Sequence, residues 1–402
     1  MKVLFVNVVY GRGSTGRIVK ELGQALERNG DSYMVAYGRS ECSDDPHGYF
    51  IGGKMDRYLH AGLSRLTDRA GFYSSLATKK LLQFIRAYNP DVIHLHNLHG
   101  YYLNIGLLFR FLAEEYSGKV IWTLHDCWAM TGHCTHFTYV GCDKWTDGCR
   151  DCPQSDAYPK SILLDKSARN YREKESLFCA VPNMTIVTVS RWLKTIAEQS
   201  YLKKYPIRCI YNGIDDRIFR PLKNRTKEEL GIMDKKMILL VSNGWGDRKG
   251  LGRAISVAAA APADWRFVMI GMKPQQIAKL PDNIIGLEKL WNQEKLIEYY
   301  SAADVFFHPS AEETFGLVIA EALSCGTPSV VYNSTACPEL IRDDGCGRIV
   351  ELSDSPGKVV TALRQAMEEK HGESMCLFPL KNSIKQTLAL YREQDAENGG
   401  LL

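Results

Sequence analysis

The sequence predicts an α/β protein of two tandem, Rossmann-like, doubly wound parallel-sheet domains. A chain of 402 residues is too long for one ordinary core, so two domains are expected. Short β-branched apolar segments alternate with helix-length segments, which implies parallel strands because each crossover then needs a helix. The pattern begins again at Met237–Ser242, where a strand leads into the Gly-rich turn 243–250. Ligands of such sheets bind beyond the carboxyl ends of the strands, so we expect the two domains to face a cleft.

The expected domain boundaries follow interruptions of this pattern. Turn residues near 202–225 separate an N-terminal domain, 1–205, from a C-terminal domain, 206–380, and residues 381–402 are expected to form a helix and tail that pack back toward the N-terminal domain. The expected strands are Val3–Tyr10, Ser32–Ala36, Val92–His96, Val120–Leu124, Thr185–Val189, Met237–Ser242, Arg266–Ile270, Val305–His308 and Ser329–Tyr332. The expected helices include 18–28, 251–260, 294–301, 317–325 and 380–395.

Composition and charge argue against several function classes. The formal charge of +4 comes without a dense Lys/Arg run, so no nucleic-acid partner is expected. No apolar stretch approaches the roughly 20 residues of a membrane helix. The apolar start Met1–Tyr10 fits a buried strand better than a signal peptide. We therefore expect a cytoplasmic protein whose twelve cysteines are mostly reduced.

The most informative segment is HPSAEETFGLVIAE, residues 308–321. A strand is expected to end and a helix to begin within it, and the backbone N–H groups at that helix N-terminus favour a diphosphate. These groups belong to Phe315, Gly316 and Leu317. Glu321, on the first turns, can accept hydrogen bonds from a ribose diol, and Glu313, in the loop, can bind sugar hydroxyls. Either acid alone could simply stabilise the helix through its dipole. The two acids together with the helix N-terminus after a strand favour a functional site.

This segment resembles the donor-site signature of family 4 glycosyltransferases, which are retaining enzymes of the GT-B architecture. The matching residues are Glu313, Phe315-Gly316-Leu317, Glu321-Ala322 and Cys325-Gly326-Thr327-Pro328, and the interdomain segment Tyr211-Asn212-Gly213-Ile214-Asp215 with Phe219 and Pro221 matches as well. The resemblance implies that Glu313 meets the transferred sugar and Glu321 the ribose. It also implies donor binding without a divalent metal, in an enzyme of the kind that builds bacterial surface polysaccharides.

Two glycine-rich turns are candidate diphosphate contacts. In Asn243–Gly250, Lys249 matches the family's phosphate-binding Lys, whereas Gly244 stands where the family has Arg, and Arg248 is the candidate replacement. A solvated Arg-Lys pair is the plainer alternative. In the first domain, Gly13 of GRGSTG lies between a strand and a helix and lets the backbone approach the donor. A dehydrogenase is disfavoured, because no acid follows the second strand.

Histidines follow two first-domain strands. His125, after Val120–Leu124, resembles the family's Thr-x-His segment, whose His touches the donor sugar or leaving phosphate; a core histidine is the alternative. The candidate acceptor-side contacts are His96, Asn97 and His99. Asp126 is the nearest carboxylate and is expected to orient His125 rather than act as a nucleophile. The family analogy therefore points to front-face transfer within an ion pair.

Two further features lie outside this signature. Cys134, Cys142, Cys149 and Cys152 have the composition of a structural zinc knot, with reduced core cysteines as the alternative. Residues 54–86 carry seven Lys/Arg against two Asp, interleaved with apolar residues. Such a helix can rest on an anionic membrane, so peripheral contact with the inner membrane face and a lipid-linked acceptor form one hypothesis, and ordinary packing forms the other.

The sequence thus predicts a hexosyltransferase-like enzyme that moves a sugar from a nucleotide-diphosphate sugar to a saccharide or lipid-linked acceptor, with no cofactor for catalysis. The alternatives are a catalytically silent nucleotide-sugar-binding protein and a sugar-nucleotide epimerase of similar fold. The joint presence of Lys249, Glu313, Glu321 and His125 argues against the silent protein. The Phe-Gly-Leu signature offers no proton relay for an epimerase.

Overall fold

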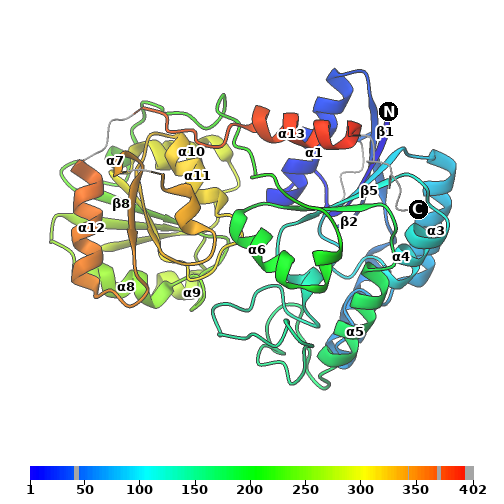
Figure 1. The fold of residues 1–402 in the computed structure, drawn as a ribbon. Helices are drawn as coiled ribbons and strands as arrows, with labels where there is room; N and C mark the ends of the chain where they lie inside the picture. Colours follow the sequence, from blue (N-terminus) through cyan, green and yellow to red (C-terminus); the bar gives the residue numbers. More distant parts are fainter. Residues whose placement is uncertain (40–44, 343, 369–372, 394–402) are drawn as a thin grey trace, which may run out of the picture. The chain divides into compact units, whose positions relative to one another are not determined.

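The computed structural model describes residues 1–39, 45–342, 344–368 and 373–393 (Figure 1). The chain forms two compact units, Met1–Tyr211 with the segment from Ser383 onward, and Asn212–Asn382. Within the described ranges, no helix is long and apolar enough to cross a membrane.

The first unit is built on a seven-stranded parallel sheet with the strand order β3-β2-β1-β4-β5-β6-β7. Its strands are β1 Lys2–Val9, β2 Ser32–Arg39, β3 Gly48–Phe50, β4 Val92–Leu95, β5 Lys119–Leu124, β6 Met184–Thr188 and β7 Ile207–Cys209. Its helices are α1 Gly13–Arg28, α2 Lys54–Thr67, α3 Ser75–Tyr88, α4 Ile105–Glu114, α5 Ser167–Phe178, α6 Arg191–Gln199 and α13 Leu380–Arg392, with 3-10 turns at Trp128–Met130 and Tyr201–Lys204.

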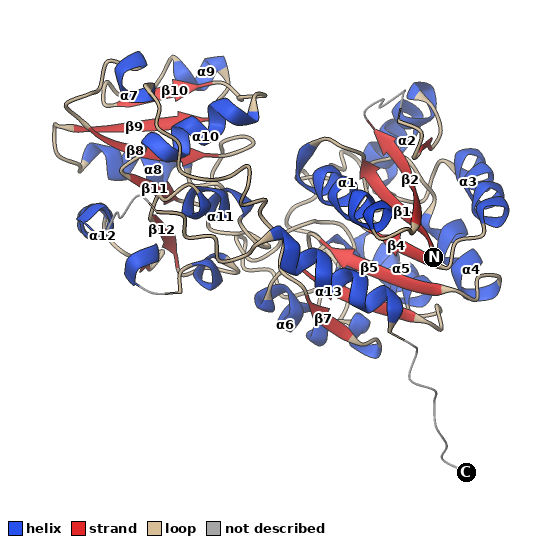
Figure 2. Ribbon diagram, turned by 90° about the horizontal axis from the view of Figure 1, so that it is seen from above, coloured by secondary structure: helices blue, strands red, loops and turns tan. Residues whose placement is uncertain are grey.

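Helices cover both faces of this sheet because consecutive strand residues point to opposite sides (Figure 2). On one face, Ile121 belongs to a core shared with α1 and with Leu388 and Tyr391 of α13. On the other face, the Trp122 ring lies 5.3 Å from Phe109 of α4 and 4.8 Å from Phe178 of α5. Helix α13 thus completes the core of the first unit.

The second unit has a six-stranded parallel sheet with the order β10-β9-β8-β11-β12-β13. Its strands are β8 Lys236–Val241, β9 Trp265–Ile270, β10 Ile284–Leu287, β11 Val305–His308, β12 Ser329–Tyr332 and β13 Gly347–Val350. Its helices are α7 Thr226–Glu229, α8 Leu251–Ala259, α9 Pro274–Ile277, α10 Gln293–Ala302, α11 Leu317–Ser324 and α12 Pro356–Glu368, with 3-10 turns at Cys337–Leu340 and Asp344–Cys346. Helices α8 and α12 share one core with Phe307, whereas Phe306 faces Tyr300 of α10.

These two sheets confirm the predicted fold class of two Rossmann-like, doubly wound domains. All nine predicted strands are present, but four strands were not predicted. Those four, β3, β7, β10 and β13, are the two edges of each sheet. Edge strands are covered on fewer sides, and β3 and β7 have only three residues each, none of them fully buried.

Candidate functional site

In the second unit, two loops meet beyond the carboxyl ends of the neighbouring strands β8 and β11. Gly250 lies in the left-handed region (φ +76°), and a Cβ there would sit 2.1 Å from the carbonyl oxygen of Pro309. The amide of Ala311 donates to the carbonyl of Arg248 at 3.0 Å. Glycine at 250 therefore lets the Gly-rich turn pack directly against the loop that carries Glu313.

The packed loops bring Lys249, Glu313 and His308 together. The Lys249 ammonium forms an ion pair with Glu313 Oε1, and His308 Nε2 lies 3.0 Å from the same oxygen. Both partners of the ion pair are largely buried, with side-chain exposures of 23% and 16%. Burial by itself raises the pKa of Glu313, but the nearby Lys249 and the His308 hydrogen bond hold it well below its usual range. The carboxylate is therefore ionised at neutral pH.

Helix α11 begins where the sequence predicts it. Gly316 caps it with φ +93°, which only glycine adopts readily, and Leu317 is its first residue. The Phe315 side chain packs into the core, 5.4 Å from the Phe378 ring, so this residue can serve a ligand only through its backbone. Glu321 is buried and accepts a hydrogen bond from the Tyr300 hydroxyl at 3.0 Å. That hydrogen bond fixes the carboxylate of Glu321, the residue that is predicted to bind the ribose.

Arg248 lies in the same cluster. Its Nη1 donates to the carbonyl of Glu312 at 3.3 Å, so the guanidinium rests against the loop before Glu313. Gly244, which occupies the family's Arg position, has a φ of +146°. The structure thus brings Arg248, Lys249, Glu313 and the start of α11 together at the carboxyl ends of the strands. The contacts of these groups with a ligand remain predictions.

In the first unit, the Gly-rich turn is fixed by Asn7 at the end of β1. Its side-chain amide donates to the Val9 carbonyl at 2.7 Å, and its Oδ1 accepts from the backbone N–H of Asn97 at 3.2 Å. Gly13 has φ +64° and open space where a Cβ would stand. Asn7 therefore ties together two predicted contact segments, the turn around Gly13 and the loop that carries Asn97.

The candidate residues that follow the strands β4 and β5 line one small cavity of the first unit. Its lining includes His96, Asn97, His99, His125, Asp126 and Trp128. His96 Nδ1 and His125 Nε2 are 2.9 Å apart, a hydrogen bond that requires one ring to donate and the other to accept. Burial lowers the pKa of His125 to about 4 despite the opposing attraction of Asp126, and it lowers the pKa of His96 further below the ordinary value. Both rings are therefore neutral at pH 7.

Asp126 binds His99 and the backbone of Trp128. Its Oδ2 accepts from His99 Nε2 at 2.7 Å, and its Oδ1 accepts from the amide of Trp128 at 2.9 Å. Burial by itself raises the pKa of this carboxyl, but His99 and the Trp128 amide bring it down to about 2. The other ring nitrogen of His99 lies 3.1 Å from the Tyr158 hydroxyl. Asp126 thus orients His99, and His125 bonds to His96.

The four cysteines of the predicted zinc knot line one further cavity of the first unit, together with His133. No group of three or more His, Cys, Asp or Glu residues among the described positions is already arranged to hold a metal ion. Beside this cavity the Lys174 ammonium is fully buried and donates to the carbonyls of Trp128 and Thr131 at 2.9 and 3.0 Å.

Some site residues have no strong signal in the sequence. His308 is the last residue of β11 and follows two buried Phe residues. A polar residue there indicates the carboxyl end of the sheet, but the sequence does not show that its partner is Glu313. His94 bonds Tyr391 of α13 at 2.6 Å and Thr123 at 2.7 Å across long sequence separations. Only the position of a polar residue at a strand end could have drawn attention to them.

Two doubly wound units with this pattern of polar loops define the class of GT-B glycosyltransferases. The model of "Glycosyltransferase Family 4" matches residues 15–217, about half of the chain, and the model of "Glycosyl transferases group 1" matches residues 223–379. The chain therefore belongs to glycosyltransferase family 4, and the predicted family membership is confirmed.

Similar proteins act in glycan biosynthesis. The chain is 26% identical over 362 residues to the putative colanic acid biosynthesis glycosyl transferase WcaC of Escherichia coli K12, with 86% of each chain covered. The fold matches sucrose-phosphate synthase of Thermosynechococcus elongatus, with TM-score 0.67, 18% identity and coverage of 97% and 98% of the two chains. It also matches Anabaena HepE in complex with UDP and glucose, with TM-score 0.66, 14% identity and coverage of 97% and 99%. The protein is a glycosyltransferase of glycan biosynthesis, as the sequence predicts.

Proposed function

We propose that this enzyme transfers a hexose-type sugar from a nucleoside diphosphate sugar, of the uridine class, with retention of configuration and without a catalytic metal. The observation that carries the proposal is the Lys249–Glu313–His308 cluster beside the N-terminus of α11. It joins a cation, a buried carboxylate and a helix N-terminus, which are the groups that a diphosphate and a sugar require. The UDP bound to the similar HepE supports the choice of uridine.

In this proposal the second unit holds the donor. Lys249 and Arg248 bind the diphosphate oxygens, as do the amides at 315–317, and these donors supply the positive charge that neutralises the leaving group. Glu321 accepts from the ribose hydroxyls, and Glu313 accepts from hydroxyls of the transferred sugar. Lys249 moves from Glu313 to the diphosphate when the donor binds.

The first unit contributes a neutral histidine and no free nucleophile in this proposal. His125 stabilises the leaving diphosphate by hydrogen bonding, because the low pKa excludes a cationic role at pH 7. Asp126 already accepts two hydrogen bonds, which disfavours it as the nucleophile of a double displacement. Retention then requires front-face attack by an acceptor hydroxyl within an ion pair, and His96, Asn97 and His99 are the proposed acceptor-side contacts.

The proposed acceptor is lipid-linked, and the enzyme meets it at an anionic membrane through helix α2. The exposed large apolar side chains of α2 and of the loop beside it are Met55, Tyr58, Leu59, Leu63, Leu66, Ile162, Leu163 and Leu164. The amide of Ile162 donates to the carbonyl of Arg65, so the loop adjoins the helix. Apolar side chains flanked by Lys and Arg are typical of interfacial helices.

Vesicle co-sedimentation tests the membrane contact. Wild-type protein should bind phosphatidylglycerol vesicles at low salt, and the double variant Leu59→Asp/Leu63→Asp should lose this binding. The matched variant Met233→Asp/Leu352→Asp changes two exposed apolar residues of the second unit and should bind as wild type. Equal binding by all three proteins would rule out α2 as the contact.

Thermal stabilisation tests donor binding. Purified protein is heated with UDP-, GDP- and ADP-sugars in the presence of EDTA, and wild type is compared with Glu321→Ala. A shift with a UDP-sugar that the variant loses supports the proposal. A shift that appears only after addition of a divalent cation would contradict metal independence, and no shift with any of these donors would contradict the proposed donor class.

A further inference from the structure

Residues 131–166 form a long irregular loop. Between the 3-10 turn at Trp128–Met130 and α5, the structure has no helix or strand. The loop nevertheless buries Phe137 and Trp145, whose rings stack with centroids 4.8 Å apart. Irregular segments of more than about 15 residues are uncommon in compact domains, because they make few regular hydrogen bonds of their own. This loop therefore needs additional fixation.

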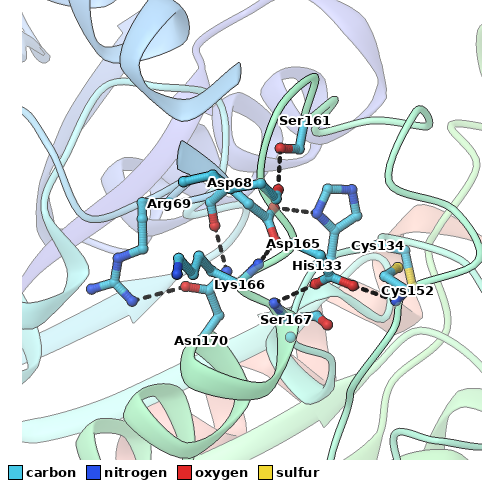
Figure 3. Close-up of polar contacts among 12 residues, drawn as sticks. Asp68, Arg69, His133, Cys134, Cys152, Ser161, Asp165, Lys166, Ser167 and Asn170 are labelled. Carbon is cyan, nitrogen blue, oxygen red and sulfur yellow. Dashed lines mark hydrogen bonds and ion pairs between the residues drawn. The ribbon is translucent and has the colours of Figure 1, made fainter. Parts of the chain in front are cut away.

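The base of the loop is fixed by carboxylates (Figure 3). Asp68, the residue after α2, binds His133 Nδ1 through Oδ1 and the amide of Lys166 at 2.8 Å through Oδ2. Asp165 accepts from the amide of Cys152 at 2.6 Å and from the amide of Ser167 at 2.8 Å. These bonds hold the two ends of the loop together, and within the loop the Gln154 side-chain amide donates to the carbonyl of His136 at 2.6 Å.

The middle of the loop also contains four thiols. One small cavity is lined by Cys134, Cys142, Cys149 and Cys152. The amide of Gly132 donates to Cys149 Sγ at 3.2 Å, which is the N–H···S contact that stabilises a thiolate. His133 Nε2 borders the same cavity and has no hydrogen-bond partner within the described structure. Such an orphaned buried atom marks a site that is incomplete without a further ligand or ion.

The charge around the cavity also suits bound thiolates. The Lys174 side chain is 1% exposed, and its ammonium contacts two carbonyls and the Trp128 ring, with the Nζ 3.4 Å from the centroid. These contacts are all neutral, and the nearby carboxylates of Asp68 and Asp126 attract the buried ammonium, so thiolates in the cavity add to the negative charge around it. A Zn²⁺ ion with four thiolates carries a net charge of −2, which Lys174 partly balances.

We propose that Cys134, Cys142, Cys149 and Cys152 form a structural Zn²⁺ site that fixes the 131–166 loop. Among the described residues, these thiols are not yet arranged as a metal-ligand set. Side-chain rotation draws the four sulfurs around the ion, and each thiol releases one proton as its Zn–S bond forms. The ion performs no chemistry on the sugar. It supports the loop that carries Tyr158, the partner of His99.

Metal content measures this site directly. Full-length protein purified without chelator should contain about one zinc per chain by mass spectrometry of the elements, and the ion should be released by a mercurial thiol reagent. The double variant Cys142→Ser/Cys149→Ser should fall below about a tenth of an equivalent. The matched variant Cys179→Ser, a half-buried cysteine outside the cavity, should keep its zinc.

If the double variant does not fold, cobalt replacement in the wild type decides the matter. Tetrahedral thiolate-bound Co²⁺ should give intense visible absorption. This absorption should disappear when added Zn²⁺ displaces the cobalt. Wild-type protein without zinc, or zinc that persists in the double variant, would overturn the proposal. Intact-mass evidence of disulfides among these cysteines would overturn it as well.

Discussion

The Lys249–Glu313 ion pair gives the most direct test of the donor site. Replacing Lys249 with Met keeps most of the length of the side chain but leaves the Glu313 carboxylate, 16% exposed, paired with His308 alone among the two cluster partners. Unit charges 4 Å apart attract by about 4 kcal/mol at an effective dielectric constant of 20, and desolvation offsets part of this. We expect the free energy of unfolding to fall by about 2 kcal/mol at pH 7.

This loss should depend on pH. Lys249 is the largest influence that lowers the pKa of Glu313, so its removal raises that pKa. A depressed carboxyl pKa contributes stability above the unfolded-state pKa of about 4.3, and this stability disappears as the pH falls through the folded pKa. The difference between wild type and Lys249→Met should therefore be full at pH 7 and shrink below about pH 4.

Thermal melting with and without UDP measures both effects. For a unit of this size, 2 kcal/mol corresponds to a loss of about 4–8 °C in Tm. The lost phosphate contact should weaken UDP binding about tenfold to a hundredfold. The control Lys295→Met breaks more exposed pairs with Glu229 and Glu298 and should change neither quantity measurably. Unchanged stability and unchanged UDP affinity in Lys249→Met would refute the reasoning.

Three further substitutions probe the supporting structure. Gly250→Ala should destabilise the second unit by at least about 1–2 kcal/mol, because residue 250 has a positive φ and a Cβ there would contact Pro309. Chemical denaturation measures this loss. The control Gly252→Ala, whose Cβ would meet open space, should not be destabilised. Tyr391→Phe should cost about 1–3 kcal/mol, because it leaves Nδ1 of the buried His94 without its partner, whereas Tyr58→Phe, at an exposed position, should cost nothing measurable. Burial lowers the pKa of His94 to about 3 in the folded protein, so the unfolded chain binds the proton more readily. The stability of the folded state should therefore fall as the pH drops from 6.5 toward 3. Melting curves recorded across this pH range should show a weaker dependence for His94→Gln.

The sequence allowed the fold to be predicted in its central parts. Strands such as Val305–His308 are buried on both faces and are therefore apolar up to their last residue, and they coincide with the observed strands. The edge strands were missed for the converse reason. Gly48–Phe50 and Ile207–Cys209 have only three residues each, with none fully buried, and such short segments do not differ from loops.

The candidate site was predicted as separate residues but not as pairs. The spacing from Glu313 to Glu321 and the glycine before α11 locate the carboxylates on a loop and a helix. The partner of each group depends on contacts between distant segments. Lys249 meets Glu313, and Glu321 meets Tyr300, only after β8, β11 and α10 have packed. Charge and hydrophobic patterns along a chain carry no information on such pairings.

The release of nucleoside diphosphate from the donor chosen by thermal stabilisation, measured in EDTA, tests the central claim most directly. Wild type and the control Lys295→Met should turn over the donor equally, with no added metal. Glu313→Gln should lower the rate by about a hundredfold or more while it binds the donor with similar affinity, because the lost charge acts mainly on the reacting sugar. Full activity in Glu313→Gln, or wild-type activity that EDTA abolishes, would contradict the account.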